Sequence, residues 1–204
     1  MLWKLGYEHG DPSLSNLMVD PKTKCGVLND WDLSYVNSED SQGHVGGERT
    51  GTIPFMALDL LCDDYWQGKI TRHYRHDLEG LIWVLPWVFL QFDGSERKNW
   101  RFDAWSTGDY EICRKEKLDA LVNFNSRDNT AQSWESEWTF ALMLLSWLRR
   151  ERFLRSDAAT FVLQPDKSDT DVYSEFCGVL EETCKKYSPL NGLLSSLQMA
   201  AALL

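Results

Sequence analysis

The chain has 204 residues, a formal net charge of −10 at pH 7 and a sequence pI of about 4.8. This excess of negative charge opposes binding to nucleic-acid phosphates and to anionic membrane surfaces. Hydrophobic residues make up 43% of the chain, enough for one folded domain, and the longest apolar run, Leu81 to Leu90, is too short to cross a bilayer.

The cysteines and the first residues favour an intracellular location. The five cysteines are odd in number and none belongs to a CxxC pair, so neither a disulfide framework nor a zinc site is indicated. Residues 1–7 are too short and mixed to form the apolar part of a secretory signal. We therefore expect a protein of the cytoplasm or nucleus.

Two short apolar runs near the start predict a β-hairpin. Leu17–Val19 and Gly26–Leu28 lie on either side of a polar turn that begins with Asp20 and Pro21. The next segment, residues 30–52, is polar and contains four glycines, with no helix or strand period. A loop of this length is usually functional or disordered.

The remainder of the chain is predicted to be helical. The segment 77–92 is apolar on nearly every side, which is typical of a helix in the middle of a core. Apolar residues at helical spacing predict a short helix at 116–122, a longer one at 133–150 and two final helices at 169–186 and 190–204. The predicted fold is mainly α with a small β-hairpin.

The residues best suited to catalysis lie in the first 30 positions. His9-Gly10-Asp11 and Asn16 form the pattern H-x-D-x-x-x-x-N before the hairpin, and Asp30 follows its second strand. A hairpin brings these two loops side by side, where Asp11 could orient an acceptor hydroxyl while Asn16 and Asp30 offer the oxygen ligands that Mg²⁺ prefers. Taken singly, each residue is better explained as a turn or cap residue. The pattern as a whole favours phosphoryl transfer.

Two later motifs follow in the order expected for a kinase. These are Arg-Thr-Gly-Thr-Ile-Pro-Phe-Met-Ala-Leu-Asp at 49–59 and Arg-His-Asp-Leu-Glu-Gly-Leu-Ile-Trp-Val-Leu at 75–85. With them, residues 9–88 resemble the fungal-type protein kinase family, a divergent branch of the protein kinases. The resemblance implies the C-terminal lobe of a protein-kinase-like fold without its N-terminal lobe, ATP and Mg²⁺ as cofactors, and a serine or threonine hydroxyl of a protein as the acceptor.

The resemblance also implies roles for single residues. Asp11 matches the catalytic aspartate, and Asn16 and Asp30 match the metal ligands. Met18 falls where kinases place a residue beneath adenine, and Thr52 matches the threonine that contacts the catalytic aspartate.

Three further residues would give structural support. His9 opens the catalytic loop, and Asp77 matches the buried aspartate that braces the backbone of that loop. Asp59 closes the activation segment in Ala-Leu-Asp, where Ala-Pro-Glu is usual, and would pair with an arginine. The candidate arginines are Arg149, Arg150 and Arg152, although this cluster could equally be a solvated helix end. We expect one partial kinase domain over residues 1–204, with the catalytic loop and hairpin at 1–29, the activation segment at 30–59 and a helical subdomain at 60–204.

Several departures from the kinase pattern bear on activity. Gly10 replaces the usual arginine, which removes a receptor for a phosphate on the activation segment, and Ser13 replaces a lysine that faces the γ-phosphate. No G-x-G-x-x-G motif, ATP-positioning lysine or helix leading into the catalytic loop is visible. We therefore expect weak or no activity from this chain alone, and an apolar face of the central helix that is covered by a protein substrate or partner.

Two alternatives to an active protein kinase remain open. The first is a non-catalytic kinase fragment or pseudokinase-like binding module, favoured by the absent nucleotide lobe. The second is a small-molecule phosphotransferase of the aminoglycoside or choline kinase type, favoured by His9-Gly10-Asp11 alone.

Overall fold

The apolar segment after residue 73 forms α2 (Tyr74–Phe89), the helix at the centre of the molecule. The computed structural model describes residues 7–23, 25–36, 51–130, 134–161 and 167–186. At the start of α2 the backbone N–H of His73 donates to Nδ1 of His76 at 3.0 Å, which caps the first turn. The helix passes through Pro86, which removes one donor, and the Leu90 N–H still donates to the Pro86 carbonyl at 3.1 Å.

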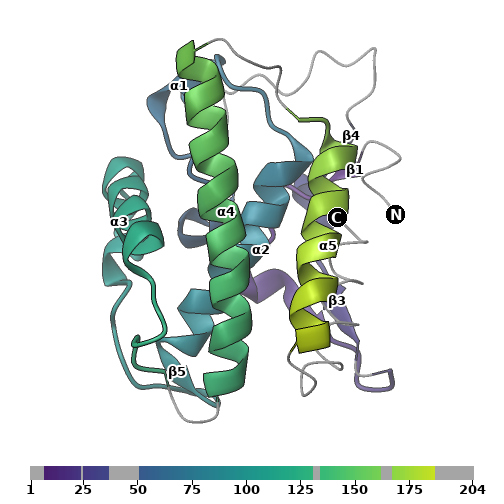
Figure 1. The fold of residues 1–204 in the computed structure, drawn as a ribbon, viewed down its shortest axis with the longest axis vertical. Helices are drawn as coiled ribbons and strands as arrows, with labels where there is room; N and C mark the ends of the chain where they lie inside the picture. The colour runs from purple at the N-terminus through teal and green to yellow at the C-terminus, as the bar shows by residue number, and fades with distance from the viewer. Residues whose placement is uncertain (1–6, 24, 37–50, 131–133, 162–166, 187–204) are drawn as a thin grey trace.

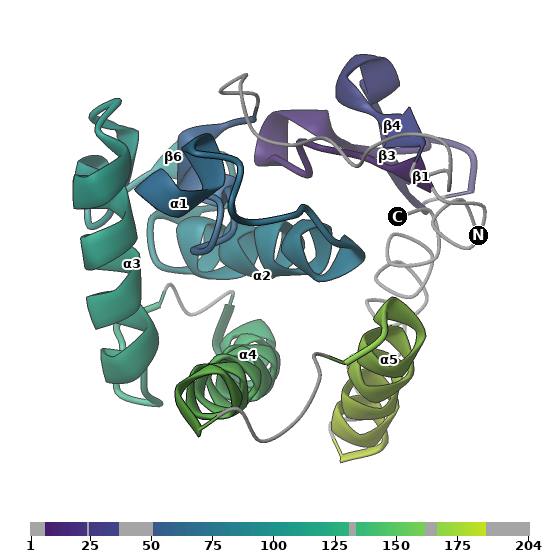
Figure 2. The same ribbon diagram turned by 90° about the horizontal axis from the view of Figure 1, so that it is seen from above.

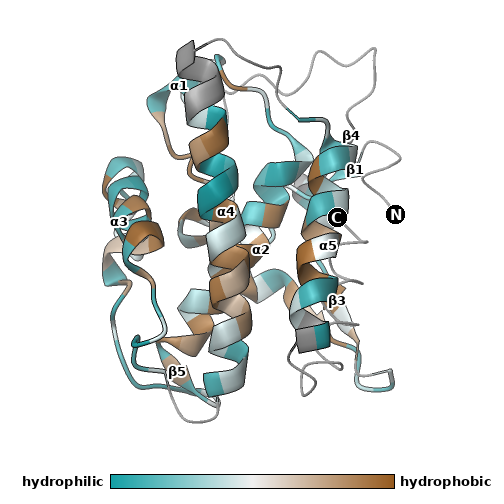
Figure 3. Ribbon diagram, viewed as in Figure 1, coloured by the Kyte–Doolittle hydropathy of each residue, from teal (hydrophilic) through white to brown (hydrophobic). Residues whose placement is uncertain are grey.

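Other helices surround α2 on two sides. α3 (Tyr110–Asn123) lies to one side, while α4 (Glu135–Phe161) and α5 (Asp169–Lys186) pack against another face of α2 (Figures 1 and 2). The two sheets formed by residues 7–36 lie on the side of α2 opposite α4, as the view from above shows (Figure 2). Hydrophobic residues concentrate on α2 and on the middle turns of α4 in front of it (Figure 3). The core therefore lies around α2.

Short helices join these elements. In the described residues these are α1 (Asp63–Trp66) and the 3₁₀ turns η2 (Leu14–Asn16), η3 (Trp31–Leu33), η4 (Ile53–Phe55) and η5 (Asp103–Ser106).

The predicted hairpin is confirmed with its bounds. β2 (Leu17–Val19) pairs with β3 (Gly26–Leu28) in antiparallel register, Leu17 opposite Leu28. Two further two-stranded sheets were not predicted: β1 (Tyr7–Glu8) pairs with β4 (Tyr35–Val36), and β5 (Phe92–Asp93) pairs with β6 (Glu96–Arg97). Strands of two residues are too short to show a period in the sequence. The mainly helical class is confirmed, and the single hairpin is corrected to three small sheets within the part of the chain that the structure describes.

Several helices extend beyond their predicted bounds. α5 spans the predicted residues, whereas α2 begins three residues earlier and α3 six residues earlier than the apolar pattern indicated. α4 continues past Arg150 to Phe161. The helix predicted at 190–204 lies outside the described residues, as does much of the polar segment after Val36.

The expectation that one apolar face of the central helix lacks cover within the chain is wrong. Thirteen of the 16 residues of α2 are buried, and α4 and α5 both pack on it. The large hydrophobic side chains that are exposed in the described part of the chain belong to other elements, among them Met18, Val19 and Val27 of the hairpin. No helix in the described segments combines the length and apolar character needed to cross a membrane. Because α2 is buried, it gives no support for the predicted protein partner, which stays a prediction.

Candidate active site

The loop between β1 and β2 is held from below by a buried ion pair. A single oxygen of Asp77, Oδ2, accepts the backbone N–H of His9 at 2.8 Å and, more weakly, that of Gly10 at 3.5 Å. The guanidinium of Arg72 donates to the other Asp77 oxygen at 2.9 Å and to the Gly10 carbonyl. Asp77 and Arg72 are 0% and 4% exposed, so each charge depends on the other and on the loop backbone. This pair fixes the backbone just before Asp11.

The ring of His9 joins the catalytic loop to the end of the hairpin. Its Nε2 lies 2.9 Å from the carbonyl of Asn29, and its Nδ1 lies 3.2 Å from the backbone N of Asp11. Both bonds are satisfied when Nε2 carries the proton and Nδ1 accepts. The indole of Trp31 covers the same imidazole edge-on at 4.6 Å. His9 is fully buried, which fits the structural support predicted for it.

Asp11 is oriented by three donors from two segments. Thr52 donates its backbone N–H to one carboxylate oxygen and its hydroxyl to the other, both at 2.9 Å. The side-chain amide of Asn16 donates to the Asp11 carbonyl at 2.9 Å and to its carboxylate at 3.3 Å. Backbone φ values of 90° at Gly10 and 115° at Gly51 lie in the region that favours glycine, next to Asp11 and Thr52 respectively. The contact predicted between residues 11 and 52 is present.

Asn16 and Asp30 lie on adjoining backbones. The N–H of Asn29 donates to the Asn16 carbonyl at 2.8 Å, so Asp30 directly follows the residue bonded to Asn16. Asp30 is exposed and adopts φ 64° and ψ 66°, the one positive φ of a non-glycine residue in the described segments. Aspartate tolerates this conformation better than most residues, and such backbones occur often at functional sites. Because the Asn16 amide nitrogen faces Asp11, its oxygen is left for another partner.

This donor set fits magnesium better than a transition metal. Across the segments that the structure describes, no three His, Cys, Asp or Glu side chains gather as a metal site. One carboxylate and one amide oxygen agree with the way Mg²⁺ is commonly bound, with phosphate and water completing its shell.

Met18, predicted to lie beneath adenine, is 51% exposed on the same hairpin, and its sulfur lies 3.7 Å from the amide nitrogen of Asn29.

The end of the predicted activation segment is fastened to α2 and α4. The carboxylate of Glu79 accepts the backbone N–H of Leu58 at 2.8 Å and the indole N–H of Trp83 at 3.0 Å. Asp59 accepts from Arg152 of α4 at 2.8 Å, which identifies its partner among the three candidate arginines. The proline of the usual Ala-Pro-Glu would have no backbone N–H at this position. Leu58 has a buried N–H, which donates to Glu79.

His76 completes this anchor as a neutral residue. Its Nε2 lies 3.7 Å from Asp59, too long for a strong hydrogen bond. Full burial lowers the pKa of His76 to about 4, despite the carboxylate beside it. Burial opposes ionisation of Asp59, but the charges of the nearby Arg152 and Arg155 favour the carboxylate and keep the pKa of Asp59 below its ordinary value.

The sequence interpretation did not identify Arg72 and Glu79 as part of this arrangement. A usable signal was present for Glu79, because a second acidic residue in an apolar helix must find buried donors. Arg72 lies in a polar stretch, where a charged residue is normally solvated. Its partner, the Gly10 carbonyl, is 62 residues away in the chain.

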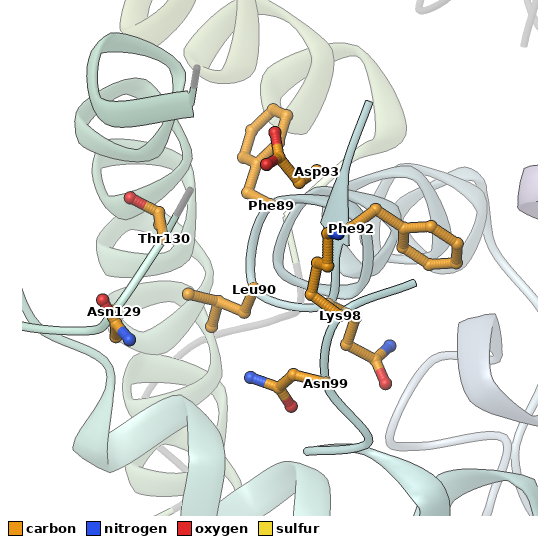
Figure 4. Close-up of a pocket in the computed structure, with 9 residues that line it drawn as sticks. Phe89, Leu90, Phe92, Asp93, Lys98, Asn99, Asn129 and Thr130 are labelled. Atoms are coloured by element: carbon orange, nitrogen blue, oxygen red, sulfur yellow. The ribbon is translucent and has the colours of Figure 1, made fainter. Parts of the chain in front are cut away.

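A separate pocket lies at the opposite end of α2. It has a volume of about 320 Å³ and is formed by the end of α2, the β5–β6 hairpin and residues 129–130 (Figure 4). Apolar Leu90 and polar Asp93, Lys98 and Asn99 contribute to its wall. None of the predicted site residues lines it, so it takes no part in the catalytic arrangement.

Comparison with known proteins points to a kinase family. A family model described as fungal protein kinase matches residues 1–89. This range contains every residue to which a catalytic, metal-binding, nucleotide-binding or supporting role was assigned above. No curated protein and no solved structure matches the chain.

Proposed function

We propose that the chain carries the phosphoryl-transfer site of a protein kinase, on the premise of the fungal protein kinase model that matches residues 1–89. The proposed reaction moves the terminal phosphoryl group of ATP to a serine or threonine hydroxyl of a protein, with Mg²⁺. The observation that carries the proposal is the hydrogen-bond network that joins His9, Asp11, Asn16 and Asn29 and fastens Asp11 to Thr52.

Asp11 is the proposed acceptor of the hydroxyl proton. Donors from Thr52 reach both of its oxygens, which holds the carboxylate plane in one orientation. Each carboxylate oxygen has a second lone pair, so the group can still accept a hydrogen bond from a substrate hydroxyl. Because phosphoryl transfer depends mainly on positioning, this fixed orientation is the chief contribution of Asp11 to the proposed reaction.

Asn16 and Asp30 are the proposed metal ligands. The amide oxygen of Asn16 and the carboxylate of Asp30 would hold Mg²⁺, which neutralises charge on the phosphate groups when bound. Ser13, which replaces the usual lysine, is buried and its hydroxyl lies 2.9 Å from that of Ser15. The chain therefore supplies no cation at that position, and the metal would carry more of the charge stabilisation.

Manganese offers a site-resolved test of these ligands. Added with ATP, Mn²⁺ should broaden the NMR signals of Asn16 and Asp30 at low stoichiometry, because a paramagnetic ion acts over short distances. Asp30→Asn should remove the broadening. Asp32→Asn is the matched control, since Asp32 is exposed on the next turn, and should preserve it. Equal broadening in the two variants would contradict the assignment of Asp30.

Turnover by the 204-residue chain on its own is expected to be slow or absent, because its sequence contains no G-x-G-x-x-G motif to cover the phosphates. Transfer of labelled phosphate to a protein acceptor measures this directly, with Asp11→Asn as the reference. Rapid transfer that requires Asp11 would contradict the expectation of low activity. Metal binding without transfer would favour the pseudokinase-like alternative.

A further inference from the structure

Lys117 is a fully buried cation in the middle of α3. Its exposure is 0%, and lysine is almost never buried unless its ammonium group is paired. The neighbouring positions of α3 carry exposed charged residues such as Lys115 and Glu116. The helical period places Lys117 on the buried face of α3, between Cys113 and Leu121, so the reason for a lysine there must lie in what it contacts.

The ammonium group of Lys117 binds the carbonyls of the segment that holds Asp11. It donates to the carbonyl of Pro54 at 3.0 Å and to that of Met56, both more than 60 residues away in the chain. It also lies 4.4 Å from the centre of the Trp83 ring, a favourable position for a cation. Lys117 therefore links α3 to the C-terminal end of η4 through the carbonyls of Pro54 and Met56.

From this geometry we propose that Lys117 is a positioning residue for Asp11, acting through η4 and Thr52; this rests on the proposed function. The link is short and made of hydrogen bonds. The N–H of Phe55 donates to the Thr52 carbonyl at 2.8 Å, which closes the turn, and Thr52 in turn donates twice to Asp11. A shift of the carbonyls held by Lys117 must therefore tilt the two donors that orient Asp11.

Two oppositely charged side chains from different helices bind the backbone of residues 54–58. Lys117 of α3 donates to its carbonyls, while Glu79 of α2 accepts the N–H of Leu58. Burial lowers the pKa of Lys117 to about 8, although the nearby Cys113 and Glu79 favour its charged form. The group therefore remains mostly protonated at neutral pH. An apolar residue would avoid the cost of burying this charge but would leave two buried carbonyls without donors.

The carboxyl carbon of Asp11 reports this positioning directly. In the full chain, Lys117→Met should move the ¹³C signal of the Asp11 side-chain carboxyl in the same direction as Thr52→Val, which removes one donor outright. Amide exchange at Thr52 should become faster by about tenfold or more, the order expected when a hydrogen bond to a charged group is released. Lys117→Arg, which keeps the charge and the donors, should restore both values.

Lys115→Met is the matched control, because Lys115 is exposed on the same helix. It should change neither signal. If Lys117→Met does not fold, Lys117→Gln retains one amide donor and should produce a smaller shift in the same direction.

An unchanged Asp11 signal in folded Lys117→Met or Lys117→Gln would overturn the proposal, as would faster Thr52 exchange in Lys117→Arg equal to that in Lys117→Met. The manganese experiment on Asn16 and Asp30 is independent of this one. If manganese and ATP broaden neither signal in the unsubstituted chain, the kinase site is rejected, and the role of Lys117 is decided by the Asp11 signal.

Discussion

Gly80 tests how closely α2 must approach the catalytic loop. A Cβ atom at this position would lie 2.6 Å from Cγ of Pro12 and 3.0 Å from the Phe55 carbonyl oxygen. The first distance is shorter than a real contact, and both neighbours are buried, so neither can move freely. Pro12 directly follows Asp11, and Phe55 belongs to η4. Gly80→Ala should therefore displace one of the two segments that meet at Asp11.

The size of the effect can be isolated with a second glycine. Gly178 lies within α5, and a Cβ atom added there would meet nothing within 4 Å. Gly178→Ala should stabilise the protein by about 1 kcal/mol through helix propensity. Gly80→Ala gains the same amount but loses about 1–3 kcal/mol to overpacking. The difference between the two variants, about 1–3 kcal/mol, then measures the clash alone.

Urea unfolding, analysed by linear extrapolation, gives both free energies of unfolding. Comparable m values in the two variants would show that the same structure unfolds. If Gly80→Ala stabilises the chain as much as Gly178→Ala does, the close approach of α2 to Pro12 is incorrect.

Two further predictions concern the charges beneath the site. Stability should fall as pH drops from about 6.5 towards 4, by about 3 kcal/mol at most. The reason is that buried His76, with its pKa lowered to about 4, takes up a proton at a lower pH than the same residue does in the unfolded chain. Urea titrations at pH 7 and about 4.5 should show a smaller loss for His76→Gln, and an equal loss would argue against a neutral His76. Asp77→Ala should cost about 3–5 kcal/mol, because it leaves the buried charge of Arg72 and the N–H of His9 without a partner. A loss below about 1 kcal/mol in the same assay would mean that this pair does not brace the loop.

Local patterns in the sequence were enough to locate the hairpin and α5. Leu17–Val19 and Gly26–Leu28 are separated by strong turn residues, and α5 has a clear apolar face. The early start of α3 escaped prediction because its first turn has no apolar period, with Ile112 exposed and Cys113 buried. The start is set by Asp109, whose carboxylate accepts the Ile112 N–H at 2.9 Å. Such a cap is a weaker signal than an apolar period.

The candidate catalytic residues and the bracing role of Asp77 were predicted from motif order, whereas the buried cations Arg72 and Lys117 were not. The order of Asp11, Asn16 and Asp30 is visible in the sequence, because each lies in a loop next to the hairpin. Arg72 and Lys117 act on carbonyl groups about 60 residues away, and no local pattern encodes which carbonyl a buried cation will meet. The sequence predicted α2 to be a core helix, but the packing of α4 and α5 on it was missed, since that packing depends on the tertiary structure.

The central claim is that Asp11, Asn16 and Asp30 serve one bound cation and one acceptor hydroxyl. A crystal of the chain soaked with Mn²⁺ and ATP, measured at a wavelength where manganese scatters anomalously, tests it most directly. The account predicts an anomalous peak at bonding distance from the side-chain oxygens of Asn16 and Asp30, with the Asp11 carboxylate facing the terminal phosphate. A peak elsewhere, or oxygens of Asn16 and Asp30 that point to different surfaces, would contradict it.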